Sequence, residues 1–88
     1  MDNIKRAIEK SIKEWEKAKE EVRKRAEALY SEICEIIEDE PQLSGQAATI
    51  LLAVYKIVLE GKYIEALGYL SLLAMSLAYR HSQKKKHD

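Results

Sequence analysis

Residues 44–79 are the longest stretch of this sequence with few charges, and they constrain the fold more than any other segment. The only charged residues in the stretch are Lys56, Glu60, Lys62 and Glu65. Gly61 divides it into two segments of helical length, because glycine is favoured just after a helix C-terminus. The pattern predicts two antiparallel helices at residues 43–60 and 62–80, joined by a short turn. Their apolar surface is larger than one partner helix would cover.

Residues 3–38 predict one long helix before this hairpin. They contain no Gly or Pro and are rich in Glu, Lys, Arg and Ala, which favour helix. Apolar residues recur close to heptad spacing, as in an amphipathic helix, and Pro41 ends the helix. Residues 11–14 have the form of a capping box, so a break near Ser11 is an alternative to a continuous helix. A continuous helix would be about 55 Å long, twice the length of either hairpin helix.

The unequal helix lengths predict that the N-terminal half of the long helix has no packing partner within the chain. The hairpin reaches only half of the long helix, and the short loop at residues 39–43 places it against residues 20–38. Residues 3–19 would then project with an apolar stripe exposed. The residues of this stripe are Ile4, Ile8, Ile12 and Trp15. Exposed apolar stripes usually mark an interface, so we expect these four residues to bind a second subunit. The alternative is that the chain folds back and covers Trp15.

The charge distribution leads to the same expectation. The net charge is zero, but residues 5–25 hold nine basic and five acidic residues, and residues 26–40 hold six acidic and no basic residues. In one helix this order opposes the macrodipole, which favours acidic residues at the N-terminus and basic residues at the C-terminus. An antiparallel second copy would pair the two regions.

These observations together predict an all-α protein. We expect a long N-terminal helix and an antiparallel hairpin, which form a single three-helix bundle over residues 1–80. The bundle is expected to form a two-fold homodimer. The basic tail at residues 81–88 is expected to be disordered.

Residues 59–70 resemble the turn and second helix of a tetratricopeptide repeat. The residues that match its G-x-Y-x-x-A-x-x-x-[aromatic or apolar] spacing are Gly61, Tyr63, Ala66 and Leu70. The sequence departs from the repeat at Ile50 and Val54, where Trp and Gly are usual, and at Leu73, where a small residue is usual. The segment is also similar to that of short archaeal helical proteins of unknown function. The resemblance implies a tight helical hairpin and a protein-binding role.

The sequence contains no motif for catalysis, a cofactor or a metal. Cys34 is the only cysteine, which excludes an intrachain disulfide and a multi-cysteine metal site, and we expect it to be a buried apolar residue. His81 and His87 form no helical His-x-x-x-His or Glu-x-x-His pair. The acidic residues between Glu32 and Glu40 are expected to form a solvated helix end. We therefore expect a protein that is not an enzyme and needs no cofactor.

Two functions remain open from the sequence. The first is a non-enzymatic interaction or scaffolding protein that acts as a homo-oligomer, with or without an additional protein partner. The alternative is a small nucleic-acid-associated protein. Its contact residues would be Arg23, Lys24, Arg25, Lys84, Lys85 and Lys86. The zero net charge and the carboxylates interleaved through residues 3–38 disfavour this alternative.

The sequence also predicts a location. The helical runs near residues 50–59 and 66–79 are too short to span a bilayer, and Lys56 and Glu65 interrupt them. The N-terminal residues have no apolar core of signal-peptide length. We therefore expect a cytoplasmic protein without membrane contact. The low content of Asn and Gln beside abundant Lys and Glu is typical of thermophilic proteins.

Overall fold

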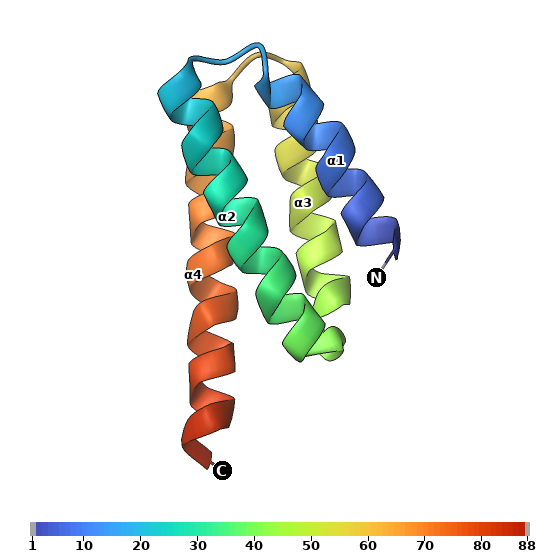
Figure 1. The fold of residues 1–88 in the computed structure, drawn as a ribbon, viewed down its shortest axis with the longest axis vertical. Coiled ribbons are helices and arrows are strands. Elements are labelled where there is room, and N and C mark those ends of the chain that lie inside the picture. The colour runs from blue at the N-terminus through green and yellow to red at the C-terminus, as the bar shows by residue number, and fades with distance from the viewer. Residues whose placement is uncertain (1, 88) are drawn as a thin grey trace.

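The computed structural model describes residues 2–87, and the side chains of residues 4–83. All regular structure in this range is helical: α1 (Asp2–Trp15), α2 (Glu20–Asp39), the short 3₁₀ helix η1 (Pro41–Leu43), α3 (Ser44–Leu59) and α4 (Tyr63–His87). The prediction of an all-α fold is confirmed. The bundle has four long helices, however, and not the expected three (Figure 1).

The predicted continuous helix at residues 3–38 is wrong, because the chain turns back at residues 16–19. The backbone amides of the first three of these residues each donate a hydrogen bond to the carbonyl three positions earlier, and Lys19 is extended (φ −60°, ψ 147°). α1 ends with Lys13 in its last turn, and α2 begins with Glu20 and Glu21 in its first turn. The charges beside the turn therefore suit two helices that meet there, whereas the last turn of α2 still has no basic residue to complement its macrodipole.

The turn lets α1 bury its apolar stripe inside the same chain. Ile4, Ile8 and Trp15 are buried, and Ile12 is partly buried against the same core. Burying a large apolar side chain contributes about 1.5–3 kcal/mol, whereas each helical hydrogen bond lost at the turn costs about 0.5–1.5 kcal/mol. The expectation that these four residues project without a cover is therefore wrong. The alternative near Ser11 is also wrong, since Ser11 lies inside α1 and is buried.

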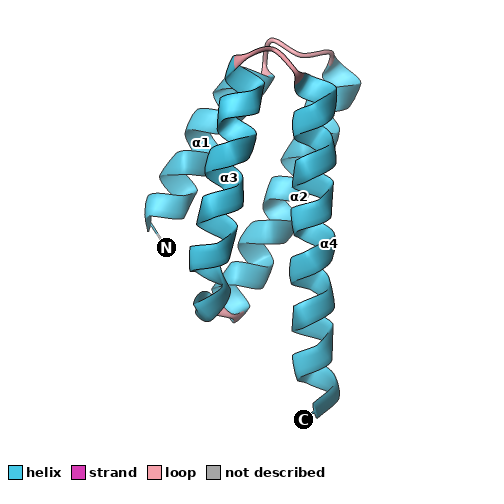
Figure 2. Cartoon of the chain, turned by 180° about the vertical axis from the view of Figure 1, so that it is seen from behind, coloured by secondary structure: helices cyan, strands magenta, loops and turns pink. Residues whose placement is uncertain are grey.

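The four helices form two helical hairpins that lie side by side in the same direction. α1 packs against α2 in the first hairpin and α3 against α4 in the second, while α1 also packs on α3 and α2 on α4 (Figures 1 and 2). α1 and α4 therefore occupy opposite corners of the bundle. Each buried residue of α1 has a buried counterpart in α3 that lies the same number of positions later in the sequence. The buried residues Ile4, Ile8, Ser11 and Trp15 correspond in this way to Ala47, Leu51, Val54 and Val58. The second hairpin thus repeats the burial pattern of the first helix.

The predicted hairpin turn at Gly61 is confirmed. Gly61 has a φ of 81°, a conformation that side-chain-bearing residues adopt with strain. Its amide donates to the carbonyl of Val58, and the amide of Lys62 donates to the carbonyl of Ile57. These two bonds form a Schellman motif, which satisfies the last carbonyls of α3.

α4 extends beyond the expected end of the bundle. The sequence predicts disorder from residue 81, but the helix continues to His87. No Gly or Pro follows Tyr79 to end it. In addition, the His81 imidazole contacts the Asp39 carboxylate at the end of α2, which holds this part of α4 against the bundle.

Candidate interaction surfaces

Trp15 joins three helices at the centre of the core. Its side chain is fully buried, and its indole Nε1 donates a hydrogen bond of 3.0 Å to the Tyr30 hydroxyl on α2. Its ring packs against Tyr63 at the start of α4, with ring centroids 5.8 Å apart. Burial raises the pKa of Tyr30, and the hydrogen bonds from Trp15 and Ser11 lower it in part. Trp15 is therefore not accessible to a partner in the folded chain.

The exposed apolar surface lies on the second hairpin instead. Among the residues with described side chains, the large apolar ones that are more than half exposed are Leu52, Leu59, Ile64, Tyr69, Leu72, Met75 and Tyr79. The last five belong to α4, and we call them the α4 stripe. Four of them lie on the side of α4 away from its fully buried residues Leu70 and Leu77, and Tyr69 lies at the edge of that side. The sequence signal for this stripe is a second apolar series at helical spacing beside the buried one.

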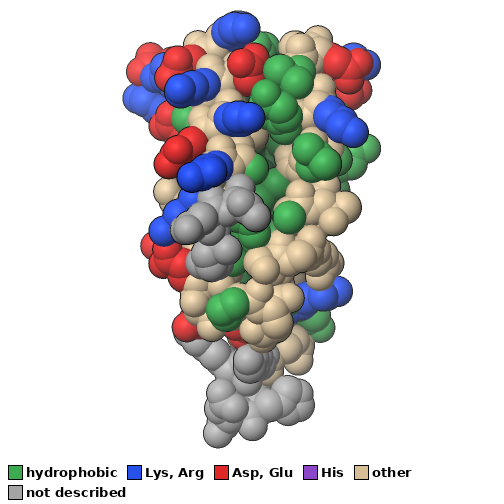
Figure 3. Space-filling model, turned by 90° about the vertical axis from the view of Figure 1, so that its right-hand side faces the viewer, with side chains coloured by type: hydrophobic (Ala, Val, Ile, Leu, Met, Phe, Trp, Pro, Cys, Tyr) green, Lys and Arg blue, Asp and Glu red, His purple; other side chains and the backbone are tan. Residues whose placement is uncertain are grey.

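α4 therefore carries large apolar residues on its solvent side as well as on its core side, although Glu65, Gly68 and Ser76 are also exposed there. Between Tyr63 and Tyr79 its only charged residue is Glu65. A helix of this composition is usually buried on all sides, yet one side of α4 faces solvent. By contrast, charged side chains cover the solvent side of α1, seen on the left of Figure 3. The solvent side of α1 is therefore charged, whereas the solvent side of α4 is mainly apolar.

A groove of about 570 Å³ lies between α1 and α3. Figure 3 shows it as a band of apolar side chains beside the charged surface of α1. Its lining is mostly apolar and includes the exposed Leu52. Arg6 and Lys10 border it from α1, and no ion pair joins either of them to another residue of the described side chains.

The acidic residues at the end of α2 border a second, more open hollow between α2 and α4. It is lined by Glu32, Glu35, Ile36, Glu38, Asp39, Ala78 and His81. Asp39 contacts His81 and Glu38 pairs with Lys5, while Glu32 and Glu35 are exposed. Within the residues that the structure describes, no group of three His, Cys, Asp or Glu side chains lies close enough to hold a metal ion.

The basic residues proposed for nucleic acid do not gather on one described surface. Lys24 forms an ion pair with Glu20 at 3.3 Å, and Arg23 approaches Glu27 at 4.0 Å. Arg25 is exposed on the same helix. The side chains of residues 84–86 lie outside the described part of α4. Because carboxylates of α2 neutralise two of the three basic residues there, the geometry adds no support for binding nucleic acid, and that function stays a prediction.

Cys34 is half-buried in α2 and has a protected thiol. Burial raises its pKa, and the negative charge of Glu38 raises it further, while Lys5 lowers it in part. Lys5 and Glu38 form an ion pair of 3.5 Å across α1 and α2. Only the thiolate reacts readily, so the environment slows its modification.

We therefore predict slow alkylation of Cys34 in the native protein. At pH 8, iodoacetamide should react several-fold more slowly with the folded chain than with the chain in urea, because the raised pKa leaves less thiolate. Glu38→Gln should speed the native reaction, since it removes a negative charge, and Glu27→Gln on the same helix should not. Equal rates for the native chain and the chain in urea would contradict the placement of Cys34.

One segment of the described residues, Pro41–Leu59, is long and apolar enough to cross a membrane by length and composition, with a mean hydropathy of 1.3. Core helices of soluble proteins have the same property. In the bundle, this segment places Ala47, Leu51, Val54 and Val58 in the core. Only 28% of the segment is buried in the bundle.

Comparison with protein-family models, curated proteins and solved structures finds no match to this chain. Two hairpins stacked in the same direction are an arrangement that helical repeat proteins also use. The resemblance of residues 59–70 to a tetratricopeptide repeat stays a prediction.

Proposed function

We propose that this chain is a non-enzymatic helical interaction protein that acts as a homodimer, in which the α4 stripe of one copy packs against that of the other. The observation that carries the proposal is that five large apolar residues of α4, the α4 stripe, are more than half exposed to solvent. Contiguous apolar surface of this kind usually marks an interaction site. The proposed interface thus moves from α1, whose apolar residues are buried, to α4.

The size of the α4 stripe is consistent with a small specific interface. At roughly 120 Å² of exposed surface for each large side chain, the five residues expose about 600 Å². Two copies would bury about 1,200 Å², which is at the lower limit of stable interfaces. The apolar centre, with Leu72 63% exposed in the single chain, has the composition of an interface core.

The few charges beside the stripe favour an antiparallel pairing of the two α4 helices. With a two-fold axis near Leu72, Glu65 of one copy would lie close to Arg80 of the partner subunit. The Arg80 guanidinium already donates to Gln46 at 2.6 Å, and it has further donors for a carboxylate. A parallel pairing would instead place the two Glu65 side chains together, and like charges in contact disfavour association.

The charged hairpin at the other end favours a closed dimer over a longer array. Stacked helical hairpins need a polar end to stop further association. α1 and α2 present charged residues to solvent and supply such an end. Association through α4 would therefore stop at two copies.

Sedimentation equilibrium tests the proposal. The wild-type chain of 10.1 kDa should sediment as a dimer at tens of micromolar, and Leu72→Lys as a monomer. The substitution should weaken dimerisation about 100-fold or more, because it places two ammonium groups at the centre of the interface. Ser31→Lys adds the same charge to the exposed surface of α2 and should leave the dimer intact. A monomeric wild type, or equal behaviour of the two variants, would refute the proposal.

A further inference from the structure

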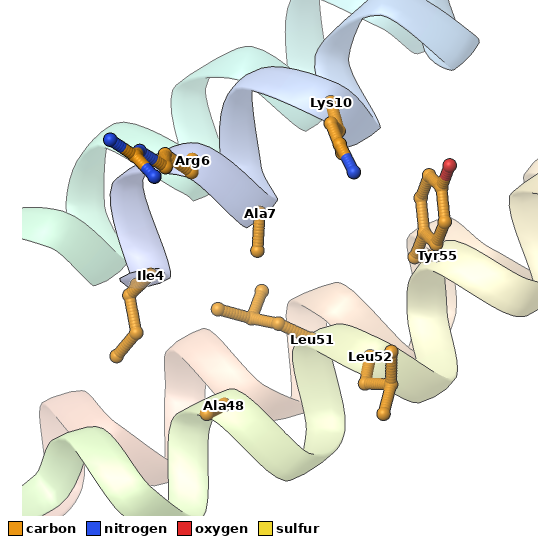
Figure 4. A pocket seen from close by; sticks show the side chains of 8 residues that line it. All are labelled: Ile4, Arg6, Ala7, Lys10, Ala48, Leu51, Leu52 and Tyr55. Atoms are coloured by element: carbon orange, nitrogen blue, oxygen red, sulfur yellow. The ribbon is translucent and has the colours of Figure 1, made fainter. Parts of the chain in front are cut away.

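The groove between α1 and α3 has the dimensions of a small-molecule site. Its volume of about 570 Å³ lies within the roughly 300–1,000 Å³ that is usual for such sites. The apolar part is lined by Ile4, Ala7, Ala48, Leu51 and Leu52. Because the alanines on the two helices are small, they leave open space between α1 and α3 (Figure 4).

The groove has a polar end opposite its apolar end. Figure 4 shows the Lys10 ammonium and the Tyr55 side chain on two sides of the same open space, at the end away from Ile4. No ion pair or hydrogen bond joins either group to another described side chain, so both have free donors. Arg6 lies one turn before Lys10 on α1, near Ile4, and its guanidinium points away from the open space (Figure 4). This arrangement matches a ligand with an anionic head and an apolar tail.

We propose that this groove binds a linear aliphatic carboxylic acid of about eight to twelve carbons. The carboxylate would accept hydrogen bonds from Lys10 and Tyr55, and the chain would lie along Leu51 and Ala7 towards Ile4. A carboxylate is the simplest group that accepts from an ammonium and a phenol together. The rise from Ile4 to Lys10 is about 9 Å, and an extended chain of about ten carbons has a similar length at ordinary C–C distances.

This inference does not rest on the proposed dimer. α1 and α4 occupy opposite corners of the bundle (Figure 1), so pairing of two α4 stripes leaves the groove accessible. A failure of one proposal therefore does not affect the other. Sedimentation reports on α4, and ligand titration reports on the groove.

The test is a titration of the full ¹⁵N-labelled chain with sodium decanoate below its micelle concentration, followed by amide chemical shifts. We expect saturable changes centred on Ala7, Leu51, Leu52 and Tyr55. Octanoate, which has two methylenes fewer, should bind about fifteen-fold more weakly than decanoate, because each buried methylene strengthens binding about four-fold. Decyltrimethylammonium, which has the same chain and a positive head, should not bind there.

Two charge reversals on α1 form a matched pair. Lys10→Glu should weaken decanoate binding about ten-fold or more, because it removes a charged donor from the carboxylate. Lys13→Glu changes the same charge at an exposed position outside the groove and should alter the affinity less than about two-fold. Circular dichroism of both variants verifies that they fold.

Three results would overturn the assignment. The first is that decanoate produces no saturable shift, or shifts spread over the whole chain. The second is equal affinity of the Lys10→Glu and Lys13→Glu variants for decanoate. The third is that an acidic amphipathic peptide shifts the groove residues while decanoate does not, which would make the groove a docking site for a helix.

Discussion

Replacing Trp15 with alanine is expected to lower the free energy of unfolding by about 3–5 kcal/mol. The indole is fully buried between α1, α2 and α4, so its removal leaves a large cavity and takes away the donor to the Tyr30 hydroxyl. A domain of this size has a total stability of roughly 5–15 kcal/mol. Urea denaturation followed by circular dichroism, which does not depend on the lost tryptophan, measures the change.

A comparison with Trp15→Phe separates the loss of stability caused by the cavity from the loss caused by the missing hydrogen bond to Tyr30. Phenylalanine keeps much of the apolar volume and the ring contact near Tyr63, but it cannot donate to Tyr30. We expect a clearly smaller loss than for alanine, because the cavity is smaller. If Trp15→Ala cost less than about 0.5 kcal/mol, as is usual for exposed positions, Trp15 would lie on the surface and the position of α1 would be wrong.

The second large effect is expected on α4, where two leucines lie on opposite sides of one helix. Leu70 is fully buried, and its replacement by alanine should cost about 2–5 kcal/mol. Leu72 is 63% exposed, so Leu72→Ala should change the unfolding free energy of the monomer by less than about 0.5 kcal/mol. The measurement is urea denaturation at a protein concentration low enough to keep the chain monomeric.

The contrast between the two leucines tests the rotation of α4 in the bundle. The substitutions are chemically identical and fall in the same helix, so helix propensity cancels. Equal losses at Leu70 and Leu72 would mean that α4 is buried on both sides in the single chain. A larger loss at Leu72 than at Leu70 would mean that the α4 stripe faces the core.

The second hairpin was predictable because its signals are local. Gly61, the lack of charge and the apolar content of residues 44–79 all act within a few residues of one another. The Schellman turn at Gly61 follows from one glycine and its two neighbours. Such local agreement predicts a hairpin without knowledge of the rest of the chain.

The turn at residues 16–19 was not predictable in the same way. It contains no Gly or Pro, and its residues are good helix formers. The burial of Trp15 against Tyr30 and Tyr63 stabilises the turn, and these partners are distant in the sequence. One signal was present: the charge order that opposed a single macrodipole placed Lys13 before the turn and Glu20 after it.

The candidate surfaces depend on the same turn. When α1 is assumed to project, its apolar residues form the predicted interface. The hairpin then has more apolar surface than one helix covers, and the side of the hairpin that stays exposed is not defined. Once α1 covers α3, the surplus lies on α4 as the α4 stripe. The groove also requires the pairing of α1 with α3, because Ala7 and Ala48 come together only there. Neither surface follows from the sequence without the fold.

The fold and both candidate surfaces depend most directly on α1 folding back within its own chain. The measurement that tests this is a nuclear Overhauser effect between the indole Nε1 proton of Trp15 and the ring protons of Tyr30, recorded with isotope filtering to select contacts within one chain. The structure predicts a strong intrachain signal, because the indole nitrogen and the Tyr30 hydroxyl are 3.0 Å apart. A continuous helix would separate the two residues by about 22 Å, and the absence of this intrachain signal would contradict the account.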